Sequence, residues 1–260
     1  MIRIGAVSYL NTKPLVHKLD LDSDRYRLSF DLPGKLADQL EIGLLDVALI
    51  PSVETFLQND LAIVSDACIA CRGPVWSVKL FSRCDLKDIR VLALDEGSRT
   101  SATLVKILLD AEFGVQPECV PLPIDANWEQ TDSDAVLVIG DRAMKSPSFG
   151  FNSEVDLGQW WREKTGLPFV FAVWAARSGI DVSEVEFHLT NSRDAGLLSL
   201  ESIARNEHEA YGLSFERCLR YFDSNLHFVL GPTEKSGLAL FYEEAAKRNL
   251  VPQNREIVFH

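Results

Sequence analysis

Positive charge is scarce in this sequence relative to negative charge. Its 260 residues include 26 Lys and Arg against 38 Asp and Glu, which gives a net charge of −12. A chain with this excess of acid repels phosphate backbones, so we expect no nucleic-acid partner. Long apolar runs are lacking as well. No stretch approaches the roughly 18 residues that span a bilayer, so we expect no association with a membrane.

Cysteine is sparse, and an export signal is missing from the start of the chain. The five cysteines are odd in number and scattered, which is typical of reduced thiols. A secretory signal has a basic stretch followed by an apolar run, and residues 1–5 do not begin such a pattern. These absences predict a cytoplasmic protein. A hydrophobic content of 47% and a charged content of 25% predict an ordinary globular fold.

The patterns of metal, cofactor and hydrolase sites are also missing. The five histidines show no metal-like spacing, so a zinc site is not expected. The segment Cys68-Ile69-Ala70-Cys71 is a single Cys-x-x-Cys, better explained by two cysteines of a strand than by a metal or redox centre. No phosphate-binding loop, dinucleotide fingerprint or Gly-x-Ser-x-Gly elbow occurs. We therefore expect no metal and no cofactor.

The chain does contain short apolar runs that alternate with helical patterns. Such an alternation predicts an α/β fold with mostly parallel sheets. The tail is predicted to be helical, apart from a short strand at 226–230. The main predicted strands are 3–7, 26–30, 46–50, 91–94 and 135–139. The predicted helices are 14–19, 33–40, one that starts at 51–52, 99–113, 157–164, 182–206, 215–222 and 235–249.

Two α/β cycles followed by a helical tail predict two lobes, with one continuous doubly wound sheet as the alternative. We expect residues 1–82 and 176–260 to form lobe 1 and residues 83–175 to form lobe 2. Residues 79–82 and 171–175 are then the crossings between the lobes. This layout leaves a cleft where strand ends and helix N-termini converge, a common place for a ligand.

The first candidate site segment follows the first strand. Ser8, Tyr9, Asn11 and Thr12 place neutral hydrogen-bonding groups at the carboxyl end of that strand, just before Pro14. Ligands of α/β proteins bind at such strand ends. The alternative is that Asn11 or Thr12 only caps the following helix.

The second candidate segment joins a predicted strand to the helix at 99–113. Gly97 permits a turn, and Ser98, Arg99, Thr100 and Ser101 begin the helix. The free N–H groups of a first helical turn bind carboxylates or phosphates, and Arg99 could add a bidentate contact. The alternative is an ordinary helix cap with a surface arginine.

The third candidate is Asp141, which follows a predicted buried strand and Gly140. Burial would raise the pKa of this carboxyl and fit it for general acid or base chemistry. It could instead cap the following helix or pair with Arg99 or Arg142. We favour a structural pairing.

Six segments together resemble the chorismate dehydratases of the futalosine route to menaquinone. Leu10-Asn11-Thr12-Lys13-Pro14 and Ser98-Arg99-Thr100-Ser101 are the most specific of the matches. After about residue 177 the resemblance is limited to a helical pattern and to Gly237, Leu238 and Phe241. The matching segments are 4–15, 43–52, 73–83, 94–101, 139–141 and 165–174.

The resemblance implies the two-lobed fold of type II periplasmic binding proteins, with the active site in the interlobe cleft. It implies a cofactor-independent enzyme whose substrate is chorismate and whose products are 3-[(1-carboxyvinyl)oxy]benzoate and water. Its segments add Ser52 and Ser77 to the candidate substrate-binding residues. We expect no obligate protein partner.

A mechanism follows as a hypothesis. We expect Ser98, Arg99, Thr100 and Ser101 to hold one of the two carboxylates of chorismate. The rest of the ligand would be contacted by Ser8, Tyr9, Asn11, Ser52 and Ser77. The base is Asp141 or the enolpyruvyl carboxylate of the substrate itself, with Asn11 as the second catalytic residue that positions the ring. The matching segments are poor in bases, which favours the substrate-assisted version.

Two other functions remain open. A non-catalytic binding protein for a small carboxylate would use the same cleft, but it would need export. The effector domain of a regulator would need a DNA-binding helix pair, for which the strand at residue 3 leaves no room.

Overall fold

The computed structural model describes residues 1–19, 24–145, 147 and 149–260, and its strands form two sheets. The first sheet has six strands, in the order β11 (His227–Val229), β4 (Leu61–Cys71), β10 (Phe169–Arg177), β3 (Val47–Pro51), β1 (Ile2–Val7) and β2 (Tyr26–Asp31). The second has five, in the order β7 (Glu118–Leu122), β6 (Val91–Asp95), β8 (Ala135–Ile139), β5 (Val78–Ser82) and β9 (Ser153–Asp156).

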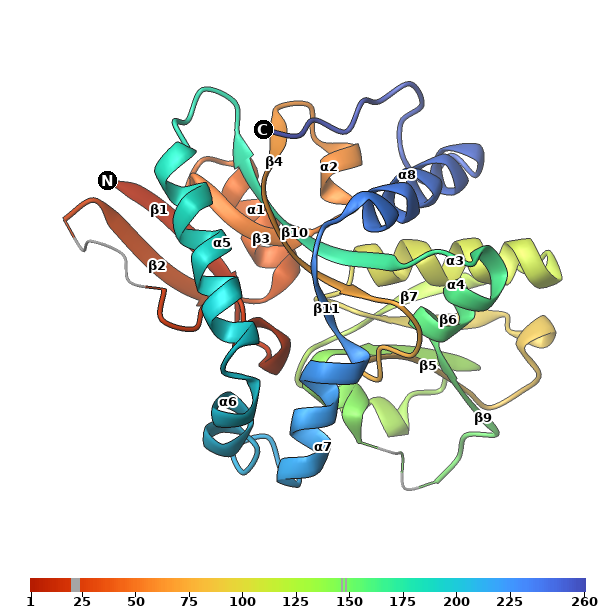
Figure 1. The fold of residues 1–260 in the computed structure, drawn as a ribbon. Coiled ribbons are helices and arrows are strands. Elements are labelled where there is room, and N and C mark those ends of the chain that lie inside the picture. Colours follow the sequence, from red (N-terminus) through yellow and green to blue (C-terminus); the bar gives the residue numbers. More distant parts are fainter. Residues whose placement is uncertain (20–23, 146, 148) are drawn as a thin grey trace.

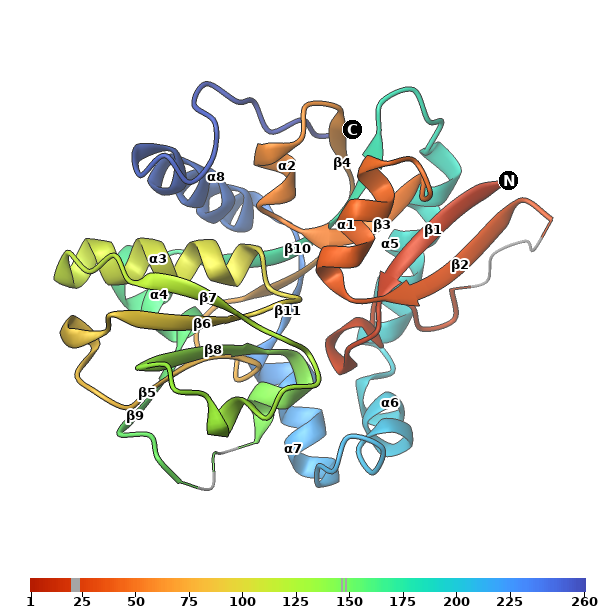
Figure 2. The same ribbon diagram turned by 180° about the vertical axis from the view of Figure 1, so that it is seen from behind.

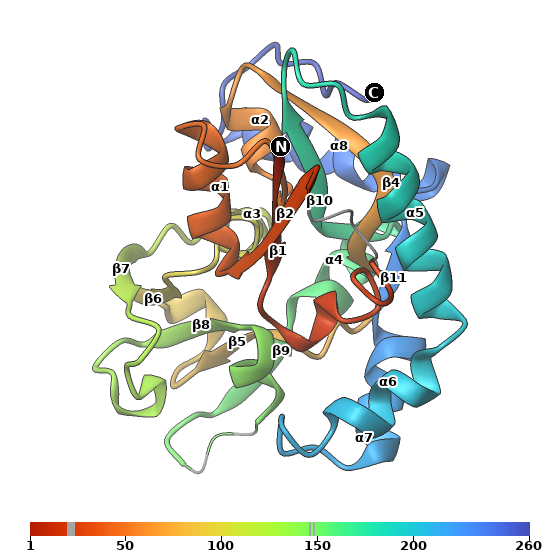
Figure 3. The same ribbon diagram turned by 90° about the vertical axis from the view of Figure 1, so that its left-hand side faces the viewer.

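The two sheets lie in different halves of the molecule (Figure 1). The first half consists of the six-stranded sheet and the helices α1 (Pro33–Glu41), α2 (Glu54–Leu57) and α5 (Ser183–Leu197). The second half is the five-stranded sheet with α3 (Thr100–Phe113) and α4 (Leu157–Thr165). In the first half, α1 and α5 cover opposite faces of the sheet (Figures 2 and 3).

The predicted strands are confirmed where the sequence is continuously apolar. Every residue of β3, β5 and β8 is buried, because helices or loops cover both faces of these strands. The predicted strands at 3–7, 46–50, 91–94 and 135–139 correspond to β1, β3, β6 and β8. The apolar pattern therefore located the centres of both sheets.

The expectation of mostly parallel sheets is wrong. β1 runs parallel to β2 and β3, and β6 runs parallel to β7 and β8. β10, however, is antiparallel to β3 and β4, and β5 is antiparallel to β8 and β9. The chain crosses from the other half directly before β5 and again before β10, so each of these strands begins at the edge of its sheet that borders the cleft. They therefore run opposite to the strands that end there.

The lobe boundaries expected after residues 82 and 175 stay a prediction. Sheet membership puts β5 in the second half and β10 in the first, so residues 79–82 and 171–175 lie inside strands. The chain passes between the halves at 72–77 and 166–168. We propose those two segments as the boundaries between the lobes.

The tail is more broken than its helical pattern suggested. The helix expected over 182–206 ends with α5 at Leu197 and resumes as α6 (Leu200–Glu207). Close packing accompanies the break, because a Cβ on Gly196 would collide with the carbonyl oxygen of Pro14. The helix expected over 14–19 is a series of turns after a short 3₁₀ turn, η1 (Leu10–Thr12).

The rest of the tail begins with α7 (Phe215–Arg220), which continues into a π-helical turn, η5 (Tyr221–Asn225). The chain then forms β11 and the last helix, α8 (Pro232–Lys247). The remaining short 3₁₀ turns are η2 (Leu86–Asp88), η3 (Trp128–Gln130) and η4 (Gly140–Met144). Among the described residues, no helix combines the length and apolar character needed to cross a membrane.

The prediction that Cys68 and Cys71 belong to a strand is confirmed, since both lie in β4. Both thiols are free and buried, and burial raises the pKa of the Cys71 thiol to about 12. A thiol with so high a pKa stays protonated at neutral pH and is a poor nucleophile or metal ligand.

Candidate functional site

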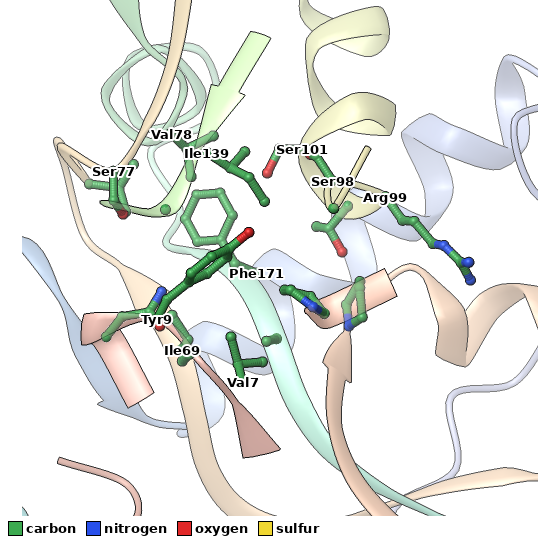
Figure 4. A pocket seen from close by; sticks show the side chains of 18 residues that line it. Val7, Tyr9, Ile69, Ser77, Val78, Ser98, Arg99, Ser101, Ile139 and Phe171 are labelled. Carbon is green, nitrogen blue, oxygen red and sulfur yellow. The ribbon is translucent and has the colours of Figure 1, made fainter. Parts of the chain in front are cut away.

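A cavity of about 520 Å³, counting its open mouth, lies between the two halves. The carboxyl ends of β1 and β3 border it from the first half, and those of β6 and β8 border it from the second. Its walls are mainly apolar, with a few convergent polar groups, as in most small-molecule sites. Figure 4 shows this pocket. Its lining residues are Val7, Tyr9, Asn11, Pro33, Pro51, Ile69, Val75, Ser77, Val78, Gly97, Ser98, Arg99, Thr100, Ser101, Ile139, Gly140, Phe171 and Ala172.

Tyr9 reaches from the first half into the middle of the pocket (Figure 4). Its ring packs against the backbone of the second half, where a Cβ on Gly140 would lie 2.9 Å from the ring. A Cβ on Gly97 would lie 3.2 Å from the Tyr9 hydroxyl. Gly140 also has a φ of 63°, a conformation that favours glycine. Glycine at both positions is thus what admits Tyr9.

The hydroxyls of Tyr9 and Ser98 are buried and have no hydrogen-bond partner among the described residues. Burial raises the pKa of the Tyr9 phenol, and the nearby Asp95 and Asp141 raise it further, so this hydroxyl stays protonated. Buried polar groups are rarely left unpaired without a reason. Two such groups in one cavity are available for hydrogen bonds to a ligand.

Ser98 lies one residue before Arg99, the residue that precedes α3. The first N–H groups of a helix have no acceptor within it, and the helix dipole adds partial positive charge there. Ser101, in the first turn of α3, also lines the pocket. The start of α3 therefore has the features of an anion site, and the binding of an anion there stays a prediction.

Arg99 is already paired with carboxylates. Its guanidinium donates to Glu54 Oε1 at 3.0 Å and to Asp38 Oδ1 at 2.6 Å, both from the first half. The side chain points away from Tyr9 and Phe171 (Figure 4). Arg99 borders the pocket, but its charge is directed toward α1 and α2.

Two other predicted residues form a junction between the halves. Thr100 Oγ1 accepts a hydrogen bond from the Val53 N–H at 3.2 Å and lies 3.4 Å from Ser52 Oγ. Ser52 is 0% exposed, donates to the carbonyl oxygen of Val170 at 2.7 Å, and does not line the pocket. Ser8 is exposed and lies outside the pocket lining.

Asp141 lies beside the pocket and is not one of its lining residues. Its carboxylate accepts a hydrogen bond from the backbone N–H of Leu10 at 3.2 Å, across the boundary between the halves. Burial raises the pKa of this carboxyl to about 6, against a lowering by the Leu10 N–H and by Lys13. Arg142, one expected partner, pairs with Asp95 at 2.6 Å.

Sequence reasoning missed Tyr221. Its ring is buried in the π-helical turn of the tail, and its hydroxyl lies near the side chains of Asn11 and Ser77. Burial is the main cause of a raised pKa, so this phenol also stays protonated. The tail showed only a helical pattern, which gave no signal that one of its tyrosines reaches the site. π-helical turns are frequent at functional sites.

In the described part of the chain, no three His, Cys, Asp or Glu side chains come together as metal ligands would. The expectation of no metal and no cofactor stays a prediction.

Solved structures with the same architecture identify the fold. A protein of Archaeoglobus fulgidus aligns with a TM-score of 0.75 at 18% identity, covering 96% of this chain and 98% of the other. The periplasmic aliphatic sulphonate binding protein SsuA of Escherichia coli aligns with a TM-score of 0.62 at 16% identity, covering 98% and 90%. The predicted fold, that of periplasmic binding proteins with a cleft between two halves, is confirmed.

Sequence relatives are more specific. A protein of Thermus thermophilus named chorismate dehydratase is 30% identical over 259 residues, which cover 92% of this chain and 93% of the relative. A chorismate dehydratase of Campylobacter jejuni is 28% identical over 175 residues, 65% of this chain and 64% of that protein. A family model described as menaquinone biosynthesis matches residues 2–247. The chain therefore belongs to this menaquinone biosynthesis family.

Proposed function

We propose that this protein is a chorismate dehydratase, a lyase that converts chorismate to 3-[(1-carboxyvinyl)oxy]benzoate and water in the futalosine route to menaquinone. The observation that carries the proposal is the pair of unpaired buried hydroxyls, Tyr9 and Ser98, in a largely apolar cavity between the halves. Membership of the menaquinone biosynthesis family and two relatives named chorismate dehydratase support it.

The chemistry of the cavity suits a small ring that carries carboxylates. We place one carboxylate at the start of α3, near the hydroxyls of Ser98 and Ser101, where the helix dipole favours negative charge. The ring would lie against the apolar wall that Ile69 and Phe171 contribute. The placement needs no free cationic side chain, in keeping with a chain whose net charge is −12.

The reaction removes a proton from the ring carbon that bears the ether and a hydroxyl from its neighbour. That proton is acidic because the ring carboxylate is conjugated with this carbon through a double bond. The ring becomes aromatic, and the departing hydroxide leaves as water. Hydrogen-bond donors around the ring carboxylate stabilise the negative charge that develops there, typically by about 3 kcal/mol for one well-placed donor.

For the base, we propose the enolpyruvyl carboxylate of the substrate, with Asn11 positioning the ring and the leaving group. The Asn11 side chain lines the cavity and lies near the hydroxyl of Tyr221. Asp141 is the alternative base, but its carboxylate is bonded to the Leu10 N–H beside the cavity. These contacts favour the substrate-assisted version.

The test is to incubate the purified protein with chorismate, without added cofactor, and to follow the products by mass spectrometry. The proposal predicts loss of one water and a new aromatic absorbance. A non-catalytic binding protein would instead release a heat of binding in calorimetry and return chorismate unchanged. We also propose that the enzyme acts in the cytoplasm, which fractionation of cells that express the full chain would test.

A further inference from the structure

The Arg99 side chain extends from the start of α3, in the second half, and its guanidinium is bonded to the first half. It precedes α3 of the second half, and its two carboxylate partners are Asp38 on α1 and Glu54 on α2. The Glu54 side chain is only 4% exposed, whereas that of Arg99 is 34% exposed. One cation thus connects three helices at the border of the pocket.

The contact is closely built on the side of the first half. A Cβ on Gly34, in the first turn of α1, would lie 3.3 Å from Arg99 Nε, so α1 packs directly against the guanidinium. The second oxygen of Glu54 accepts a hydrogen bond from Gln58 Nε2 at 2.9 Å. Both oxygens of the buried carboxylate are therefore engaged, and the partner of Arg99 is held in place.

The balance of charge argues against a further carboxylate here. One guanidinium faces two carboxylates, so a substrate carboxylate at Arg99 would meet a local excess of negative charge. A substrate carboxylate at Arg99 would have to compete with Asp38 and Glu54 for the charge of one guanidinium. The hydroxyls of Ser98 and Tyr9, in contrast, have no partner to give up among the described residues.

Thr100 strengthens the same connection. Its hydroxyl lies 3.4 Å from Ser52 Oγ and accepts from the Val53 N–H, directly before Glu54 in the first half. Two consecutive residues, Arg99 and Thr100, are thus bonded to the neighbouring half. Ser98 and Ser101, which flank them, line the pocket.

We propose that Arg99 is a positioning residue that docks the start of α3 onto α1 and α2, and so holds the two halves closed around the pocket. It does not itself bind the carboxylate of the substrate. The kinetic part of the test rests on the proposed function, because it uses chorismate turnover. A second part, a distance measurement, is independent of it.

The kinetic test compares Arg99→Met with Glu54→Gln. If Arg99 holds the cleft closed, both substitutions reduce the closed fraction of the enzyme. A tenfold smaller closed fraction raises KM by about tenfold. The double variant should then be little worse than either single variant, because both remove the same contact. We expect kcat to change by less than about threefold, since the reacting groups in the remaining closed molecules are unaltered.

A direct substrate ligand would respond in the opposite way. Glu54→Gln would free the guanidinium from a competing carboxylate, so KM would fall below that of the wild type. This result would overturn the proposal. Asp38→Asn changes the exposed partner and serves as a milder variant if Glu54→Gln folds poorly. Its KM should rise if Arg99 holds the cleft closed and fall if Arg99 binds the substrate.

The second part measures the distance between the halves without any ligand. Spin labels would be attached to the exposed Cys119 of β7 and to Glu41→Cys at the end of α1, in a Cys84→Ser background. We expect a single short distance for the otherwise unaltered chain and a longer, broader distribution with Arg99→Met. Arg99→Lys keeps the charge but has a single ammonium group in place of the planar guanidinium that spans Glu54 and Asp38, so its distance should fall between them.

The matched control is Arg3→Met. Arg3 pairs with Asp46 at 2.7 Å within the first half, so its loss removes a comparable ion pair and should leave the distance unchanged. An unchanged distance with Arg99→Met would overturn the role of Arg99. If the wild type fails to turn over chorismate while Arg99→Met still lengthens the distance, the proposed function fails and the role of Arg99 stands.

Discussion

The turn before α3 and the turn after β1 face each other across the pocket, and they use their side chains differently. In the turn before α3, Ser98 is buried and unpaired, while the next two residues, Arg99 and Thr100, are bonded to the opposite half. In the turn after β1, Tyr9 extends unpaired into the pocket, and the backbone of Leu10 is bonded to Asp141 of the other half. Each turn thus divides into a part that faces a ligand and a part that connects the halves.

Whether a side chain already has a hydrogen-bond partner distinguishes residues that face a ligand from residues that connect the halves. A ligand-facing residue should affect turnover when it is changed and should contribute little to the free energy of unfolding. A residue that connects the halves should affect stability or cleft closure first. Each substitution below tests one side of this comparison.

The largest effect is expected for Asn11→Ala, on the ligand-facing side. Removal of a group that acts on the reacting ring should lower kcat by about 10²–10³-fold. Asn127→Ala is the control, since Asn127 caps a 3₁₀ turn of the second half and should leave kcat unchanged. Steady-state kinetics measures both. Wild-type turnover by Asn11→Ala would refute the positioning role.

The next largest effect on turnover is expected for Gly140→Ala. Both Gly140 and Gly114 have a positive φ, of 63° and 67°, so alanine should cost about 1 kcal/mol of unfolding free energy at either position. Only Gly140 faces the Tyr9 ring, whereas a Cβ on Gly114 meets open space. Gly140→Ala should therefore also lower kcat/KM by tenfold or more, equivalent to about 1.4 kcal/mol. Equal kcat/KM values for the two variants would contradict the packing of Tyr9.

Asp141→Asn tests the connecting side through pH. Because the pKa of this carboxyl is raised from 3.8 to about 6, the folded protein binds more protons than the unfolded chain between these values. The stability of the wild type should fall as pH rises from about 4 to 6, by up to about 3 kcal/mol. Asp141→Asn has no carboxyl to titrate at this position and lacks this loss of stability. Chemical denaturation should therefore show that the variant is more stable than the wild type at pH 7.5 but not at pH 4.

Turnover by Asp141→Asn separates the two candidate bases. An amide oxygen can still accept the bond from the Leu10 N–H, so the turn should keep its place. Retention of most of kcat supports the substrate carboxylate as base. A loss of kcat comparable with that of Asn11→Ala would make Asp141 the base instead.

The smallest effect is expected for Ser98→Ala. Loss of one hydrogen bond to a ligand should raise KM by about tenfold or less, and stability should not fall because Ser98 Oγ has no partner among the described residues. Ser52→Ala is the matched comparison. Its hydroxyl is bonded to the carbonyl oxygen of Val170, so its loss should cost about 1 kcal/mol of stability and leave KM nearly unchanged. A loss of stability with Ser98→Ala and a raised KM with Ser52→Ala would contradict this division of roles.

The sequence predicted the parts of the fold that depend on continuous apolar runs. β3 and β8 are buried over their full length, and such runs are recognisable without a structure. Strand direction was not predictable in this way. β5 and β10 are antiparallel to their neighbours because the chain crosses between the halves just before each of them. The break between α5 and α6 was missed as well, since helix periodicity does not report the contact of Gly196 with Pro14.

The candidate site was predicted as a set of segments, and the structure distinguishes among their residues. Tyr9, Asn11, Ser77 and Ser98 line the cavity, but which of them are unpaired depends on contacts between distant segments. The bonds of Arg99 to Asp38 and Glu54 and the contact of Tyr221 with Asn11 join residues far apart in the chain. No local pattern encodes such contacts.

A crystal structure of Asn11→Ala with bound chorismate would test the division between ligand-facing and connecting residues most directly. We predict a carboxylate of the ligand within hydrogen-bonding distance of the Ser98 and Tyr9 hydroxyls, with the Arg99 guanidinium still bonded to Asp38 and Glu54. A carboxylate bound to the Arg99 guanidinium, with both of those ion pairs broken, would contradict it.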